Sequence, residues 1–322
     1  MSQVWYVLVM VLSLVGNSAG AEGVQDFIVS MSKEHGFLIS DLRTVFDQVS
    51  FRLEIIEAMS RPAEAKPWFE YREIFVTPDR IEEGVQFWKK NQAALVAAEA
   101  KYGVDPAILV AILGVETRYG SKTGTYRVID ALATLAFQYP KRASFFREQL
   151  EEYLLLARTE KIDPLSPKGS YAGAMGLPQF IPTSFRDFAV DLDGDGHRDI
   201  WNNPWDAVGS VGNYLLKHGW QSGAPIAVAV DIGEVNPAPL LEAGTKPELH
   251  WNRLRSLGFQ TEVAVVGNPE VALLRLEGED FPEYWLGFQN FYSITRYNHS
   301  SLYAMAVYQL AQEIKASLAR SH

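Results

Sequence analysis

Residues 106–121 read PAILVAILGVETRYGS, an apolar run that carries no charge until Glu116. The two residues at its start, Asp105 and Pro106, are typical of a helix N-terminus, because Asp caps free N–H groups and proline fits the first helical position. Apolar side chains then follow helical spacing, at Ile108, Leu109, Ile112 and Val115. The stretch therefore predicts a buried helix that ends near Gly120 and carries a carboxylate in its last turn.

The position of Glu116 bears on its protonation. The free carbonyl groups at the end of a helix carry partial negative charge, which raises the pKa of a nearby carboxyl group. Apolar neighbours act in the same direction, whereas Arg118 would lower the pKa. A glutamic acid that stays protonated near neutral pH is what general acid catalysis requires. A structural glutamate paired with a nearby arginine is the alternative, and this segment alone does not separate the two.

The composition excludes several classes of protein. The chain has 322 residues, of which 48% are hydrophobic and 21% charged, so it can form about two domains or one large one. Its formal net charge is -10 and no Lys/Arg-rich stretch stands out, which argues against a nucleic-acid-binding protein. There is no cysteine, so the chain can form no disulfide and carry no lipid on a cysteine.

The N-terminus predicts export. Residues 4–15 are apolar apart from Ser13, a length typical of a signal-peptide core and short for a membrane span. Ala19, Gly20 and Ala21 then offer a cleavage site of the A-x-A type, so we expect residues 1–21 to be a signal peptide. A retained N-terminal anchor is the alternative, because no Lys or Arg lies near the first residue.

Helical patterns dominate the rest of the chain and predict a mainly α fold. The segments with this pattern are 27–49, 81–102, 128–137, 144–158, 184–190, 206–219 and 302–318. Between residues 223 and 286 the runs IAVAVDI, TEVAVVG and VALLRLE alternate with Pro- and Gly-rich turns. These short β-prone runs predict a small mixed α/β subdomain inside the helical fold.

A glycine- and alanine-rich stretch follows, KGSYAGAMGLPQFIPTSF at residues 168–185. Its small residues allow another backbone or a ligand to approach closely, and Ser170 and Gln179 supply hydrogen-bonding groups. Close packing between two helices explains the small residues equally, and taken alone the segment favours that explanation.

The segment DLDGDGHRDIWNNPWD, residues 191–206, has the spacing of a calcium-binding EF-hand loop. Positions 1, 3, 5 and 7 of such a loop are taken by Asp191, Asp193, Asp195 and His197, the histidine through its backbone carbonyl. Position 12, where a bidentate glutamate is expected, holds Asn202, so Asp206 would have to close a lengthened loop. An acidic, solvated turn is the alternative.

The last motif is FYSITRYNHSSLYAMAV at residues 291–307. It places Tyr297, Asn298 and Tyr303 near the start of the last helix, where tyrosine rings can stack on sugars and the amide can bond to hydroxyl groups. Taken alone, these are typical core and cap residues. The chain contains no H-E-x-x-H or P-loop motif and no cysteine nucleophile, so one glutamate beside tyrosines remains as the candidate for catalysis.

Four stretches, GVETRYG, GSYAGAMGLPQFIP, DLDGDGHRDIW and ITRYNHSSLYAMAV, occur in the order typical of one family. The chain resembles the membrane-bound lytic murein transglycosylase B family, glycoside hydrolase family 103. The resemblance implies a lysozyme-like helical core over residues 101–222, with a helical N-terminal region over 22–100. A small β-containing subdomain over 223–290 and a C-terminal helix over 291–322 would complete it. The implied activity is that of a lyase, cleavage of the β-1,4 bond between MurNAc and GlcNAc of peptidoglycan without water, which leaves 1,6-anhydro-MurNAc ends.

The resemblance also assigns roles. Glu116 would be the single acid and base. The implied glycan contacts are Ser170, Gln179, Tyr214, Tyr297, Asn298 and Tyr303. The implied ligands of a structural Ca²⁺ are Asp191, Asp193, Asp195, His197 and Asp206, and no cofactor would take part in catalysis.

Peptidoglycan glycan strands would be the partner, with other cell-wall enzymes as candidates and no nucleic acid. The missing lipid-carrying cysteine implies a soluble periplasmic form. A hydrolytic muramidase and a non-catalytic peptidoglycan-binding protein are the alternatives.

Overall fold

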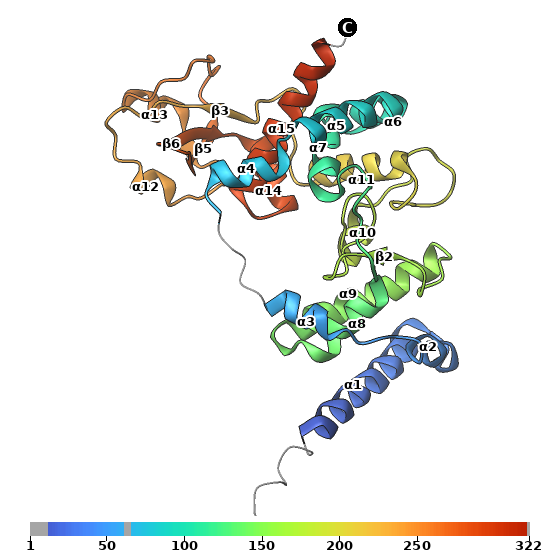
Figure 1. Cartoon of the computed structure of the whole chain (residues 1–322). Helices are drawn as coiled ribbons and strands as arrows, with labels where there is room; N and C mark the ends of the chain where they lie inside the picture. Colours follow the sequence, from blue (N-terminus) through green and yellow to red (C-terminus); the bar gives the residue numbers. More distant parts are fainter. Residues whose placement is uncertain (1–11, 61–65, 321–322) are drawn as a thin grey trace, which may run out of the picture. The chain divides into compact units, whose positions relative to one another are not determined.

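The computed structural model describes residues 12–60 and 66–320 and confirms a mainly helical chain with small antiparallel sheets (Figure 1). The contacts divide the chain into two compact units. Unit 1 comprises Met1–Pro62, Gly124–Met175 and Phe180–Asp187, and unit 2 comprises Ala63–Thr123, Gly176–Gln179 and Phe188–His322. Each unit is thus assembled from separate stretches of sequence.

Residues 1–11 of the predicted signal peptide, residues 1–21, lie outside the described residues, and residues 12–21 belong to a helix that begins at Leu12. Among the described helices, none combines the length and the apolar character that a membrane crossing requires.

Unit 1 is a helical unit with one short sheet. Its elements are α1 (Leu12–His35), α2 (Ile39–Phe46), α3 (Leu53–Ser60), β1 (Tyr126–Arg127), α8 (Val128–Gln138), η1 (Pro140–Arg142), α9 (Ala143–Thr159), β2 (Lys168–Gly169) and α10 (Pro182–Phe188). The helical pattern over residues 27–49 is interrupted, because Gly36 adopts a positive φ of 70° between α1 and α2. Edge-to-face rings of Phe27, Phe46 and Phe137 pack the first two helices against α8.

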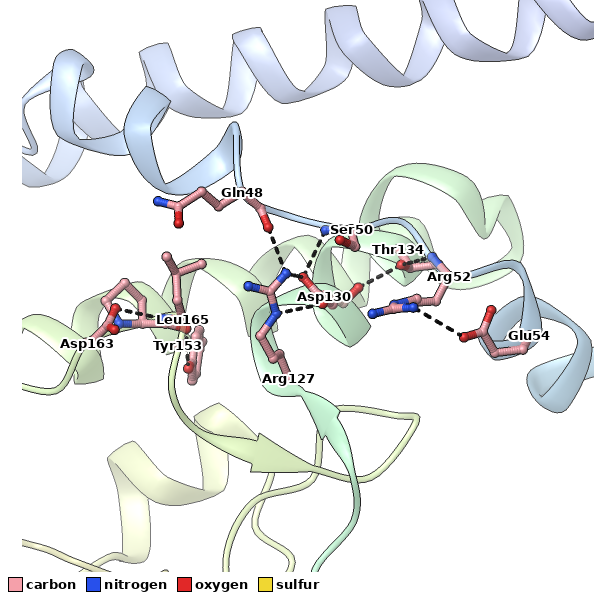
Figure 2. Close-up of polar contacts among 11 residues, drawn as sticks. Gln48, Ser50, Arg52, Glu54, Arg127, Asp130, Thr134, Tyr153, Asp163 and Leu165 are labelled. Atoms are coloured by element: carbon pink, nitrogen blue, oxygen red, sulfur yellow. Dashed lines mark hydrogen bonds and ion pairs between the residues drawn. The ribbon is translucent and has the colours of Figure 1, made fainter.

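A buried carboxylate fixes the segment between α2 and α3 to α8 (Figure 2). Asp130 is 1% exposed, pairs with Arg127 at 2.8 Å and accepts the backbone N–H of Ser50 at 3.0 Å. One turn later, the hydroxyl of Thr134 accepts the backbone N–H of Arg52 at 3.0 Å. A buried charge is tolerated when it is paired and hydrogen-bonded, and here it holds the segment that joins α2 and α3 in place.

Unit 2 contains the motif helix and the larger sheet. Its helices are α4 (Trp68–Phe75), α5 (Pro78–Lys90), α6 (Gln92–Tyr102), α7 (Pro106–Thr117), α11 (Pro204–Lys217), α12 (Ala238–Leu241), α13 (Trp251–Ser256), α14 (Gln289–Tyr297) and α15 (Ser301–Arg320). Its strands are β3 (Ala227–Ala229), β4 (Leu249–His250), β5 (Glu270–Glu277) and β6 (Pro282–Gly287). Helix α7 lies in the core of this unit, since every residue from Pro106 to Val115 is buried.

The start of α7 is as predicted, and α15 is its main packing partner. The Asp105 carboxylate accepts the backbone N–H of Ala107 at 2.9 Å, and Pro106 is the first helical residue. Helix α15 packs against α7, α5 and α4.

The pattern over residues 81–102 proves to be two helices, α5 and α6, that meet at Asn91.

The four-stranded antiparallel sheet has the order β3-β6-β5-β4 and confirms β structure in the region predicted to be mixed. Its apolar face packs on α12 and α13 through Leu240, Trp251, Leu254, Val271 and Leu273. The β-prone run at residues 261–267 forms no strand. The side chains of Val263 and Val266 are 63% and 90% exposed, so this apolar run covers no face of the sheet.

Candidate active site

Glu116 lies half-buried in the last turn of α7, and the turn around it is fixed by side-chain hydrogen bonds. The buried hydroxyl of Thr117 donates to the carbonyl of Leu177 at 3.0 Å and accepts the backbone N–H of Gly120 at 3.0 Å. These bonds tie the end of the helix to the segment 176–179 of the same unit. The carboxylate is therefore placed by the backbone on both sides of it.

The structure contradicts the alternative that Glu116 is a structural residue paired with a nearby arginine. Arg118, the nearest arginine in sequence, pairs instead with Glu83 on α5 through two hydrogen bonds of 2.6 Å. Within residues 12–60 and 66–320, Glu116 takes part in no ion pair. Its hydrogen-bond partner is Tyr303 on α15, whose hydroxyl donates to Oε1 of Glu116 at 2.6 Å.

Burial raises the pKa of Glu116 from its ordinary value of 4.5 to about 7, and the hydrogen bond from Tyr303 opposes this shift. The direction is the one that the sequence predicts from the apolar neighbours of this residue. At neutral pH the carboxyl group is then present in both its protonated and its ionised form. One group can accordingly donate a proton and later accept one.

Aromatic rings line up beside this carboxyl group. The rings of Tyr297 and Tyr303 are nearly parallel, 8° apart with their centroids 6.4 Å apart. Tyr214 on α11 contacts Tyr297 with a centroid distance of 4.8 Å, and the ring of His218 stacks on Tyr214 with a centroid distance of 4.0 Å. The hydroxyl of Tyr297 donates to the carbonyl of Pro178 at 2.6 Å, which fixes the orientation of that ring.

The three tyrosines differ in access. Tyr303 and Tyr214 are buried, at 2% and 8% exposure, while Tyr297 is half-buried. The hydroxyl of Tyr214 donates to the carbonyl of Arg296 at 2.5 Å, so it supports the end of α14. Tyr303 thus contacts the candidate acid directly, and Tyr214 lies against the ring of Tyr297.

The other three residues predicted to contact the glycan are Gln179, Asn298 and Ser170. The side-chain amide of Gln179 donates to the carbonyls of Gly176 and Thr123 at 2.9 and 3.2 Å. Asn298 is exposed and extended at the end of α14. Ser170 belongs to unit 1, where its hydroxyl accepts the N–H groups of Ala172 and Ala174.

Tyr71 on α4 belongs to the site and is missed by the sequence analysis. Burial first, and then the negative charge of Glu116, raises the pKa of Tyr71, Tyr303 and Tyr297. The electrostatic surroundings of the carboxyl group are therefore tyrosine hydroxyls. The aromatic run WFEYREIF, residues 68–75, is the signal that could have indicated α4.

A second group of polar side chains forms the acidic loop of unit 2. Carboxylate oxygens of Asp191, Asp193 and Asp206 all lie within 4.8 Å of one another. Asp191 accepts the backbone N–H groups of Gly194 and Gly196 at 2.6 and 2.8 Å, which wraps the loop around it. Such an arrangement of oxygens suits a hard cation such as Ca²⁺.

Asp206 closes this group from the first turn of α11. It is fully buried, and its two oxygens accept the N–H groups of Leu192 and Asp199 at 2.9 and 2.8 Å. Burial and then the charges of Asp193 and Asp191 raise the pKa of Asp206 to about 6. A bound cation would relieve that repulsion, so the residues present fit such an ion.

The other predicted ligands lie outside this carboxylate group. The side chain of Asp195 is exposed and accepts the backbone N–H of His197 at 2.8 Å. Asn202, at the position of the usual glutamate, donates from its side chain to Asp199 at 3.1 Å. The carboxylates that the fold brings together are therefore those of Asp191, Asp193 and Asp206.

Comparison with known proteins yields one family model. The family described as Transglycosylase SLT domain matches residues 19–312. The chain is also 42% identical over 314 residues to the membrane-bound lytic murein transglycosylase B of Escherichia coli, covering 94% of this chain and 86% of the relative.

Solved structures of similar proteins share the fold. The soluble lytic transglycosylase SltB1 from Pseudomonas aeruginosa is 49% identical with a TM-score of 0.87, covering 93% of this chain and 99% of that one. The Escherichia coli lytic transglycosylase SLT35, solved in complex with calcium, is 43% identical with a TM-score of 0.86, covering 92% and 94%. SltB3 from Pseudomonas aeruginosa, solved in complex with NAG-anhNAM-pentapeptide, is 34% identical with a TM-score of 0.83, covering 91% and 79%.

Proposed function

The chain belongs to the transglycosylase SLT domain family and is a peptidoglycan lytic transglycosylase, and we propose that Glu116 alone performs both proton transfers of its reaction. The observation that supports this role is a half-buried carboxyl group whose hydrogen-bond partner is the hydroxyl of Tyr303 at 2.6 Å, where burial raises its pKa to about 7. Among the groups that shift this pKa in the described part of the chain there is no second carboxylate. Most glycosidases use two carboxylates, so a single one needs a substrate group as its partner.

The proposed reaction runs in two steps. Protonated Glu116 donates its proton to the bridging oxygen while the bond to C1 of NAM breaks, and the N-acetyl oxygen of the same sugar stabilises the cation. The C6 hydroxyl of NAM then attacks C1, and the Glu116 carboxylate takes the proton of that hydroxyl. The products are a free hydroxyl on the leaving sugar and a closed 1,6-anhydro ring, with Glu116 protonated again.

Glycan strands of peptidoglycan are the substrate, and the site residues suit a hydroxyl-rich polymer. In unit 2 we assign glycan contacts to Gln179, Tyr214, Tyr297 and Asn298, with Tyr303 holding the acid. Tyr71 extends this assignment from α4. In unit 1 we assign a glycan contact to Ser170. Sugar rings stack on aromatic faces, and the absence of strong positive charge in this set fits a polymer that is bound by stacking rather than by charge.

The mass of the products tests the proposed reaction. Digestion of purified sacculi should release disaccharide-peptides that end in 1,6-anhydro-NAM, lighter by one water than the hydrolysis products. Mass spectrometry before and after borohydride reduction checks this, because anhydro ends resist reduction. Products that carry reducing ends would identify a hydrolytic muramidase and contradict the proposed role of the C6 hydroxyl.

We also assign a calcium ion to the acidic loop, held by Asp191, Asp193 and Asp206, with Asp195 and the His197 carbonyl as further ligands. The support is the clustering of three carboxylates around a buried Asp206 and the calcium complex of the related SLT35. Such an ion would neutralise this cluster and fix the loop against the start of α11. No step of the reaction passes through it.

Calcium should therefore raise the melting temperature. A ligand that binds only the folded state stabilises it by about 2.7 kcal/mol at a hundred times its Kd, which corresponds to a shift of roughly 5 to 10 °C. Thermal melts with calcium and with a chelator measure the shift. Asp193→Asn should reduce it, whereas Glu99→Gln, an exposed change on α6, should not. Equal melting temperatures in calcium and in chelator would contradict this site.

Export to the periplasm completes the proposal, since peptidoglycan lies outside the cytoplasmic membrane. The support is the apolar segment and the A-x-A sequence within residues 1–21. Other cell-wall enzymes remain candidate partners.

A further inference from the structure

The turn that carries Glu116 ends in an unusual way. The two residues after Thr117, Arg118 and Tyr119, both adopt left-handed backbone conformations, with φ of 49° and 58°. For residues with a side chain this conformation costs on the order of 1 kcal/mol or more each, and it persists only where the surroundings impose it. Contacts with α5 supply that constraint.

Two reciprocal hydrogen bonds join α5 to the end of α7. The guanidinium of Arg80 donates to the carbonyl of Gly114 at 2.7 Å, and the hydroxyl of Tyr119 donates to the carbonyl of Arg80 at 2.8 Å. Gly114 lies two residues before Glu116, so the Arg80 bond holds the last turn of the helix directly. One turn further along α5, Glu83 holds Arg118 through two bonds of 2.6 Å.

The ring of Tyr119 fits a slot that only glycine leaves open. A Cβ atom at Gly84 or at Gly114 would lie 2.6 Å from the Tyr119 hydroxyl oxygen, which is closer than real atoms approach. The Tyr119 ring also packs on Phe87 with a centroid distance of 5.7 Å. Helices α5 and α7 therefore approach each other closely at this point, with Tyr119 between them.

Further contacts hold the side chain of Arg80 in place. Its guanidinium lies over the ring of Phe75 at 5.3 Å, and burial lowers its pKa. Its Nε atom is buried without a hydrogen-bond partner among the described residues, which costs free energy at this position. Arg80 is half-buried and its guanidinium is directed at the carbonyl of Gly114 in spite of this cost, so it holds the helix that carries this carbonyl.

We infer that Arg80 and Tyr119 are positioning residues, which hold the last turn of α7 so that Glu116 meets the hydroxyl of Tyr303. This inference rests on the proposed role of Glu116 and adds the residues that position its carboxyl group. The carboxyl group is thus set from the α5 side by backbone contacts and from the α15 side by the 2.6 Å bond of Tyr303. A displacement of about 1 Å at a reacting group can cost about a hundredfold in rate.

Kinetics of the full-length enzyme on a soluble NAG-NAM oligomer test the inference. Tyr119→Phe removes one hydroxyl and should lower kcat roughly fivefold to tenfold, while KM stays within about twofold. Arg80→Ala should lower kcat about a hundredfold, and Arg80→Lys should recover most of that loss, because one donor and the charge are retained.

Tyr153→Phe is the matched control. In unit 1, Tyr153 donates to the carbonyl of Pro164 at 2.8 Å, so this variant loses the same kind of bond as Tyr119→Phe. We expect the two variants to lose similar thermal stability but only Tyr119→Phe to lose kcat. Equal kcat values for the two, or a change confined to KM, would overturn the inference.

The same experiment separates the two claims. If Glu116→Gln is inactive while Tyr119→Phe behaves like Tyr153→Phe, the positioning role fails and the acid-base role stands. If Glu116→Gln stays active, the acid-base role itself fails. If Arg80→Ala does not fold, Tyr119→Phe and Arg80→Lys still decide the question.

Discussion

Glu116→Gln should lower kcat/KM on peptidoglycan by about 10⁴-fold, at the upper end of what one general acid-base group contributes. The amide keeps the size of the side chain and can still accept the hydrogen bond of Tyr303, so the fold around it should persist. It can neither protonate the bridging oxygen nor accept the proton of the C6 hydroxyl. Because one group is assigned to both steps, no second carboxylate remains to support a partial reaction.

Release of soluble anhydro products from sacculi measures this loss, and Glu99→Gln is the matched control. Glu99 is exposed on α6, so the same chemical change there should leave turnover as it is. Binding of the inactive Glu116→Gln variant to sacculi should persist, since stacking on tyrosines does not require the acid. Unchanged turnover in Glu116→Gln would instead favour a non-catalytic peptidoglycan-binding protein.

The same substitution should make the enzyme more stable at alkaline pH. Burial favours the protonated form of Glu116, whose pKa rises from 4.5 to about 7 on folding. The folded state therefore binds a proton more tightly than the unfolded state, and this contribution is lost as the pH rises from about 4.5 through 7. The shift corresponds to about 3 kcal/mol, so Glu116→Gln should gain roughly that much relative to wild type above pH 8.

Urea unfolding of both proteins between pH 4.5 and 8.5 measures this difference. Other titrating groups affect both proteins alike, so the difference between them isolates Glu116. It should grow from pH 4.5 to about 7 and then stay constant, while the difference between Glu99→Gln and wild type stays near zero throughout. A gap that does not change with pH would mean that the carboxyl group titrates normally in the folded protein.

The sequence predicts the helix of the site and its acid because local signals suffice there. Asp105 and Pro106 mark the start of α7 by short-range chemistry, and the uncharged run up to Val115 can be satisfied only by burial. The spacing of Asp191 and Asp193 similarly predicts a turn around one point, and the fold brings the carboxylate of Asp206 within 4.8 Å of theirs; its role as a metal ligand stays a prediction.

Features that depend on packing between distant segments could not be predicted from the sequence. Helix α4 is short and follows a proline-containing segment, and it is held in unit 2 by α15, where Arg72 donates to Gln309 at 2.6 Å. Tyr71 was therefore missed with it. The partner of Arg118 was likewise undecidable, because Glu83 lies 35 positions away and reaches it only once α5 and α7 have packed.

The β-prone runs show that a local signal can also be present without the element forming. The runs that formed β3 and β5 became strands because each found a neighbour in the sheet, with β6 between them. The run at residues 261–267 has equal β propensity but found none, and Val266 remains almost fully exposed. Propensity in a strand is realised only by cross-strand contacts, which one sequence segment does not reveal.

Direct titration of the Glu116 carboxyl group is the most decisive measurement. Carbon-13 NMR of protein labelled at glutamate side chains, with Glu116→Gln to assign the signal, gives its midpoint in the folded enzyme. The proposed mechanism requires a midpoint near pH 7, together with a decline of kcat/KM above that pH. A midpoint near 4.5, with activity that does not follow it, would contradict the assignment of Glu116 as both acid and base.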